Sequence, residues 1–124
     1  MKKISFYIFT FIICAVTFSS CYNDKEAYLY PFGSGCDSTN VTYSQSIAPI
    51  MSSYCNNCHS TALASGGVVT DNYAGLNTVA LNGKLSAGVN WAAGFSTMPK
   101  GGSKLSVCDL AKINKWITDG APNN

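Results

Sequence analysis

The sequence predicts a small all-α domain, and three observations lead to that fold class. Apolar residues recur at helical spacing in residues 44–54. Residues 106–117 form a second helical segment that carries both a start signal and a stop signal. No stretch of any length alternates apolar and polar residues as a half-buried strand does, and no internal repeat or coiled-coil pattern is present.

Residues 44–54 are expected to form the first helix of the domain. Four apolar side chains fall at i, i+3, i+4 and i+7 and therefore share one face: Ile47, Ile50, Met51 and Tyr54. Pro49 is compatible with this helix if Ser46 is the N-cap, because the amides of the first turn need no partner within the helix. The helix would end directly before Cys55.

The C-terminal helix has the clearest boundaries. Ser106 is the expected N-cap, and Asp109 three residues later makes an acidic variant of the capping box. Leu105 and Leu110 are spaced for the flanking hydrophobic staple. The expected buried stripe is Leu110, Ile113, Trp116 and Ile117, and the helix should stop at Gly120 and Pro122.

The residues between these two helices give weaker signals. Residues 71–80 are expected to form a short helix with Tyr73, Leu76 and Ala80 facing inward, stopped at Asn82-Gly83. Residues 85–95 contain Trp91 and Phe95, which are candidates for lining a pocket.

The N-terminus indicates export. Lys2 and Lys3 precede an uncharged apolar run over residues 4–18, and Ser19-Ser20-Cys21 follows. This is the order of a secretory signal, and Ser-Ser-Cys resembles the lipobox of bacterial lipoproteins, in which the cysteine is lipidated. A plain signal or a retained transmembrane anchor is the alternative, although the run is short for a span of about 20 residues. We therefore expect a lipoprotein-type signal peptide over residues 1–20, a tether over residues 21–40 and a domain over residues 41–124.

The charge balance excludes a nucleic-acid partner. Without the signal, the chain holds six Lys, no Arg, and six Asp plus Glu. Binding of nucleic acid needs a basic stripe, which is absent from this sequence. A domain of this size is also marginal on its own core, and a cofactor or cross-link would help to stabilise it.

Cys55-Asn56-Asn57-Cys58-His59 has the C-x-x-C-H pattern of covalent haem c attachment. Two thiols three positions apart can add to the two vinyl groups of one porphyrin, and the adjacent His59 then reaches the iron. The alternatives are a thioredoxin-like redox pair, which would need a βαβ setting, a zinc site completed by a further cysteine, and a Cys55–Cys58 disulfide.

Cys36 and Cys108 are the remaining thiols of the domain. An oxidising compartment favours a disulfide between them, provided that the fold brings them into bonding geometry. The bridge would close a long loop and stabilise the fold by about 4 kcal/mol in the chain-entropy model.

Met98 is the candidate for a second iron ligand. His59 is the only histidine of the chain, so two histidine ligands from one molecule are excluded. Met1 belongs to the signal, and Met51 lies one helical turn before Cys55 and is expected in the core. Met98 precedes Pro99, Lys100, Gly101 and Gly102, a loop that could fix its thioether, and His/Met ligation raises a haem's reduction potential.

These motifs together resemble class I cytochrome c, and most of all the small domains of bacterial lipoproteins and the planctomycete-type family. The resemblance covers residues 41–122 and depends on four stretches: residues 47–50 (Ile-Ala-Pro-Ile), 54–59, 98–102 and 116–122. It implies N- and C-terminal helices packed around one covalent haem c, attached by Cys55 and Cys58 and ligated by His59 and Met98. The sequence departs from the family in its short interval between His59 and Met98, which implies an open haem edge, and in the Cys36/Cys108 pair.

The function implied is one-electron transfer, without catalysis, between redox proteins of the bacterial envelope. The chain would be held on the periplasmic or outer-membrane face by lipid on Cys21. The alternatives are a five-coordinate haem protein that binds a gas or peroxide, and a haem subunit of a larger dehydrogenase. Near-zero charge on the mature chain predicts weak electrostatic steering toward partners.

Overall fold

The computed structural model describes residues 36–124, which belong to one compact unit. The expected signal peptide, Cys21 and residues 21–35 of the expected tether lie outside the described residues. From Cys36 to Asn124 the regular structure is entirely helical, with no strand, which confirms the all-α class. No helix in this part of the chain is long and apolar enough to cross a membrane.

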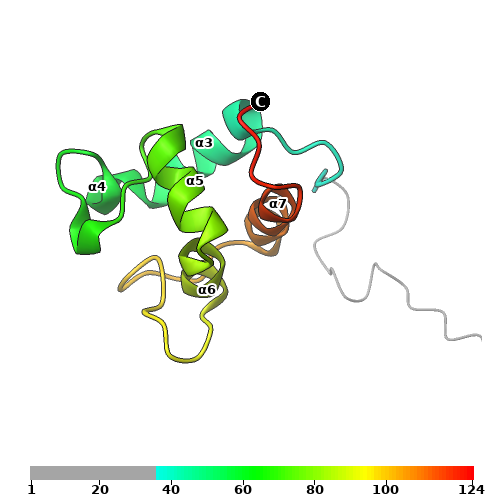
Figure 1. The fold of residues 1–124 in the computed structure, drawn as a ribbon. Helices are drawn as coiled ribbons and strands as arrows, with labels where there is room; N and C mark the ends of the chain where they lie inside the picture. The colour runs from blue at the N-terminus through cyan, green and yellow to red at the C-terminus, as the bar shows by residue number, and fades with distance from the viewer. Residues whose placement is uncertain (1–35) are drawn as a thin grey trace, which may run out of the picture. The chain divides into compact units, whose positions relative to one another are not determined.

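Seven helical elements follow one another along the described chain (Figure 1). They are the π-helix η1 (Tyr43–Ile47), α3 (Ala48–Tyr54), α4 (Asn56–His59), the 3-10 turn η2 (Ser65–Gly67), α5 (Tyr73–Leu81), α6 (Lys84–Asn90) and α7 (Val107–Thr118).

The first helix begins earlier than the sequence predicts. Thr42, and not Ser46, is the N-cap: the Thr42 hydroxyl oxygen accepts a hydrogen bond from the Gln45 N–H (3.2 Å). The first turn is wider than an α-turn, since the Ala48 N–H donates to the Tyr43 carbonyl five residues back. Pro49 is the second residue of α3 and lies in its first turn, where its missing N–H and its ring do least harm.

Three of the four residues on the predicted apolar face of this helix are buried, namely Ile47, Ile50 and Met51. Tyr54, the last residue of α3, is the exception, with 48% of its surface exposed.

The helix α7 agrees with its predicted signals. The Ser106 hydroxyl oxygen accepts from the Asp109 N–H (3.0 Å), and the same hydroxyl donates to the Asp109 carboxylate (2.8 Å). Ile113 and Trp116 are buried, and Leu110 and Ile117 are partly buried against the same core. Gly120 takes the left-handed backbone that ends many helices.

The helix predicted over residues 71–80 is present as α5, and a further helix, α6, follows it. Asn72 caps α5, Leu76 and Ala80 are buried, and Gly83 turns the chain in a left-handed conformation. The sequence predicted no helix after this turn, but residues 84–90 form α6.

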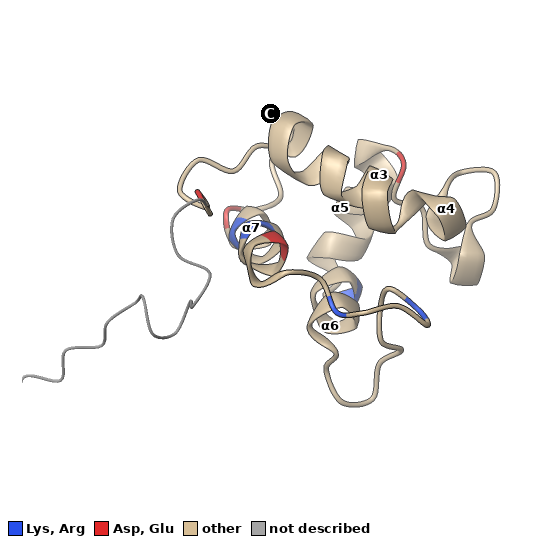
Figure 2. Cartoon of the chain, turned by 180° about the vertical axis from the view of Figure 1, so that it is seen from behind, with Lys and Arg blue, Asp and Glu red and all other residues tan. Residues whose placement is uncertain are grey.

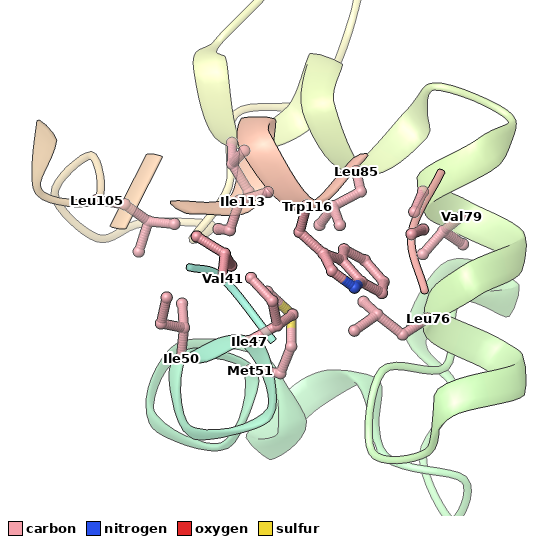
Figure 3. Close-up of a cluster of buried hydrophobic side chains, with 13 residues drawn as sticks. Val41, Ile47, Ile50, Met51, Leu76, Val79, Leu85, Leu105, Ile113 and Trp116 are labelled. Carbon is pink, nitrogen blue, oxygen red and sulfur yellow. The ribbon is translucent and has the colours of Figure 1, made fainter. Parts of the chain in front are cut away.

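The core joins the two ends of the described chain (Figure 3). Trp116 of α7 has no exposed surface and lies between side chains of η1–α3, such as Met51, and side chains of α5, such as Leu76. Its indole N–H donates to the Pro122 carbonyl (2.9 Å), so the buried polar atom has a partner.

The C-terminal residues cap the first helix. The Asn124 side-chain oxygen accepts from the Tyr43 N–H (2.8 Å), and its backbone carbonyl accepts from the Ser44 N–H (3.0 Å). These bonds satisfy amides that have no partner within η1.

Candidate functional site

A cavity of about 260 Å³ lies beside the segment that carries Cys55 and His59. Its lining is mainly apolar, with four polar members, and consists of Cys55, His59, Val68, Thr70, Val79, Lys84, Leu85, Gly88, Val89, Phe95, Ser96 and Met98. The cavity reaches the surface, because Lys84, Phe95 and Ser96 are all exposed. An apolar cavity with a few polar groups is the usual form of a cofactor site.

The structure brings three of the four predicted site residues to this cavity. Cys55, His59 and Met98 line it, and they come from the α3–α4 junction, the end of α4 and the loop after α6. Cys58 lies on the exposed side of α4 and is not part of the lining. Met51 is buried in the core and does not line the cavity, as predicted.

The two cysteines of the motif are free thiols in different surroundings. Burial raises the pKa of the Cys55 thiol to about 11, so this group is neutral at physiological pH. Cys58 is exposed. The structure therefore does not contain the Cys55–Cys58 disulfide that the sequence left open.

Cys36 and Cys108 stand together, away from the motif. They form a disulfide with their Cα atoms 5.5 Å apart, so the fold permits the bridge that the sequence favoured. A zinc site completed by one of these two cysteines would require that cysteine beside Cys55 and Cys58. Within residues 36–124, no three His, Cys, Asp or Glu side chains are grouped closely enough to hold a metal ion.

A backbone carbonyl orients the imidazole of His59. The Nδ1 atom lies 3.1 Å from the Ser65 carbonyl oxygen, which can only accept, so Nδ1–H is the donor of this bond and Nε2 is the ring nitrogen left for a ligand. Ser65 returns to His59 through a turn in which the N–H groups of Leu63 and Ala64 both donate to the Ser60 carbonyl, and Ala64 has a left-handed backbone. Metal-ligating histidines typically make this kind of bond with the ring nitrogen that faces away from the metal.

Thr70 holds the segment that carries His59 by hydrogen bonds to two of its residues. It is 4% exposed and lines the cavity. Its N–H donates to the His59 carbonyl (2.7 Å), and its hydroxyl donates to the Asn56 side chain (2.9 Å). The residues around α4 are thus held to the chain that leads into α5.

A second clamp closes the loop between His59 and α5. The Asp71 carboxylate accepts from both the Thr61 N–H (2.7 Å) and the Thr61 hydroxyl (2.8 Å). These bonds lower the pKa of Asp71, the backbone bond contributing most.

Met98 is attached to α6 through both of its backbone polar groups. Its N–H donates to the Gly88 carbonyl (3.1 Å), and its carbonyl accepts from the Trp91 indole N–H (2.9 Å). The Met98 side chain lies directly against Gly88: a Cβ built on Gly88 would be 3.4 Å from Met98 Cγ. The loop therefore fixes Met98 through α6 as well as through its own Pro and Gly residues.

Charges are sparse and unevenly distributed around the site. The loop between α6 and α7 carries Lys100 and Lys104 and no carboxylate, whereas α7 carries charges of both signs (Figure 2). Lys84 is the only charged residue in the cavity lining. The cavity offers no pair of carboxylates and no second imidazole for acid–base chemistry.

The prediction from sequence missed the α6 wall of the cavity. Leu85, Gly88 and Val89 lie at i, i+3 and i+4, which is the spacing of one helical face and was a usable signal. Of the two aromatic residues expected in the pocket, Phe95 lines the cavity. Trp91 does not line it, and its indole N–H instead donates to the Met98 carbonyl.

None of the family models, curated proteins or solved structures compared with the chain matches it.

Proposed function

We propose that this chain is a membrane-tethered one-electron carrier, a mono-haem c-type cytochrome with His59 and Met98 as iron ligands. The observation that supports this best is that Met98, from the loop after α6, lines one apolar cavity with Cys55 and His59 of the C-x-x-C-H motif. A thiol, an imidazole and a thioether on one apolar cavity match the donor chemistry of haem c.

Each residue has a defined part in the proposal. Cys55 and Cys58 would hold the haem covalently, and attachment at Cys58 would require this exposed thiol to turn toward the cavity. His59 presents Nε2 while its Nδ1–H is bonded to Ser65, and Met98 supplies the soft ligand. The bound haem would supply a one-electron iron couple whose potential is raised by His/Met ligation.

The protein's own contribution is to hold the ligands in place within a mainly apolar cavity. The bonds of Thr70 hold the His59 segment. Gly88 of α6 accepts from the Met98 N–H, and the indole of Trp91, the C-cap of α6, donates to the Met98 carbonyl. A site whose ligands do not move between oxidation states suits electron transfer. The one histidine of the chain would be committed to iron, which supports a carrier and not an enzyme.

The proposal places the carrier in the bacterial envelope. Lipid on Cys21 would anchor the chain, residues 22–40 would act as a tether, and redox proteins of the envelope would be its partners. Two acyl chains are needed for stable attachment, so Cys21→Ser should release the protein from membranes or block its processing. Membrane retention with an uncut N-terminus would support a transmembrane anchor instead.

The central test uses full-length protein matured in a host with haem-attachment machinery. Mass spectrometry after acid-acetone extraction should show one haem per chain, and the double variant Cys55→Ser, Cys58→Ser should show none. Zinc without haem in the mature protein would contradict the proposal.

A matched pair of methionine variants tests the ligand. Met98→Leu should remove the weak far-red sulfur-to-iron band, open the iron to carbon monoxide and lower the reduction potential. Met51→Leu makes the same change in the core and should leave all three properties unaltered, at a stability cost of less than about 1.5 kcal/mol. A high-spin wild type that binds carbon monoxide readily would favour the gas-binding alternative. Co-purification with a stoichiometric oxidoreductase would favour the dehydrogenase subunit.

A further inference from the structure

We propose that Trp91 is a positioning residue, which holds Met98 in place through its indole N–H and thereby sets how firmly Met98 stays on the iron. The predicted effect on iron ligation rests on the proposed function, whereas the hydrogen bond from Trp91 to Met98 does not depend on haem. It assigns a role to a side chain that lies outside the cavity lining.

The backbone of Trp91 is the first observation. Trp91 ends α6 with φ 63° and ψ 42°, in the left-handed region that bulky side chains rarely adopt. Helices that end in this way usually have glycine or asparagine at the turn. Gly83 and Gly120 fill such positions elsewhere in this chain, so a tryptophan at residue 91 needs a reason beyond the turn itself.

The hydrogen bond of the ring supplies that reason. The Trp91 Nε1–H donates to the Met98 carbonyl at 2.9 Å, across a loop of six residues. Since the Met98 N–H is already bonded to Gly88, the indole completes a two-point attachment of this one residue to α6. An aliphatic or phenyl side chain at position 91 could not make the second bond.

Lys104 supports the indole from the far end of the loop. Its Nζ lies 5.8 Å from the Trp91 ring centroid and donates to the Asn90 carbonyl (2.9 Å). The ring is thus held between its own helix end and a lysine that follows Met98 by six residues. Trp91 remains 40% exposed, so the ring contributes little to the core.

The other tryptophan of the chain provides a matched control. Trp116 also donates its indole N–H to a backbone carbonyl, that of Pro122, at the same 2.9 Å. Trp116 lies in the core and is not part of the cavity lining. Replacing either tryptophan with phenylalanine removes one equivalent hydrogen bond, but only one of the two bonds reaches Met98.

The experiment compares Trp91→Phe with Trp116→Phe in haem-loaded, full-length protein, with carbon monoxide as the probe of free iron. Loss of one neutral hydrogen bond should raise the Met98-dissociated fraction, and with it the rate of carbon monoxide binding, about fivefold in Trp91→Phe. Lys104→Gln should give a smaller rise, about twofold. Trp116→Phe should leave the rate of carbon monoxide binding unchanged while lowering the denaturation midpoint.

Amide exchange gives a readout that does not depend on iron ligation. The Met98 N–H should exchange about fivefold faster in Trp91→Phe and at the wild-type rate in Trp116→Phe. Equal carbon monoxide and exchange rates in Trp91→Phe and wild type would overturn this inference while leaving His/Met ligation intact. A wild type that lacks the far-red band would instead contradict the proposed function, and the exchange of the Met98 amide would then decide on Trp91 by itself.

Discussion

Replacing Gly75 with alanine is expected to destabilise the domain, although alanine is the better helix former. Gly75 lies in the first turn of α5, where its N–H is bonded to the Asn72 side chain (2.9 Å). A Cβ built on Gly75 would come within 2.7 Å of the Val69 carbonyl oxygen and 2.9 Å of the Val69 side chain. Because the nearest atom belongs to the backbone, the contact cannot be relieved by a change of rotamer.

The magnitude follows from two opposing effects. Alanine in place of glycine favours a helix by about 1 kcal/mol. Overpacking of this kind costs about 1–3 kcal/mol, and a backbone contact belongs in the upper half of that range. The net loss is therefore about 1–2 kcal/mol, which corresponds to a fall in Tm of about 5–15 °C for a domain of this size.

Thermal unfolding followed by far-UV circular dichroism measures this loss. Thr78→Ala is the control, because Thr78 is an exposed residue of the same helix and its replacement creates no contact. Val69 precedes Thr70, which binds the His59 carbonyl, so Gly75→Ala should also loosen the site and weaken the far-red band. A Gly75→Ala protein as stable as Thr78→Ala would refute the packing argument.

Three further predictions concern the framework around the site. The double variant Cys36→Ser, Cys108→Ser should lose about 4 kcal/mol of unfolding free energy in a urea titration, because the bridge spans 72 residues; an unchanged midpoint would show that the bridge is not formed in the mature protein. Hydrogen bonds from Thr61 lower the pKa of Asp71 in the folded protein. The ionised Asp71 carboxylate therefore contributes to the free energy of unfolding above the ordinary pKa of about 3.9, and this contribution is lost as the pH falls through the lower pKa of the folded state. Asp71→Asn should accordingly be less stable than wild type at neutral pH and show a flatter acid limb, whereas a parallel acid limb would contradict this assignment. Ser106→Ala should cost about 1 kcal/mol through loss of the N-cap, measured by the same titration, and an unchanged midpoint would show that this cap does not contribute.

Local patterns determined much of the fold. Short-range periodicity and capping residues predicted the all-α class, the extent of α7 and its cap at Ser106, because these signals act within a few positions of the chain. For the same reason the sequence located α5 and its end at Gly83. It failed at the start of the first helix, where the capping signals of Thr42 and Ser46 compete and a π-turn ahead of Pro49 favours Thr42.

The candidate site was predicted only in part. The C-x-x-C-H spacing and the count of histidines and methionines selected Cys55, Cys58, His59 and Met98 without any structure. The identification of haem itself remains a proposal. The α6 wall was missed because α6 has only seven residues and one of the three on its cavity face is glycine, so the helical spacing was present but weakly apolar.

What only the tertiary structure decided are the contacts between residues far apart in sequence. It placed Met98 on the same cavity as His59, brought Cys36 to Cys108, and directed the indole of Trp91 to the Met98 carbonyl. Such contacts depend on how helices pack and where loops return, and this is set by the burial of side chains such as Trp116 in the shared core. The sequence thus determined which residues could act and the helices that carry most of them, and packing determined which of them meet.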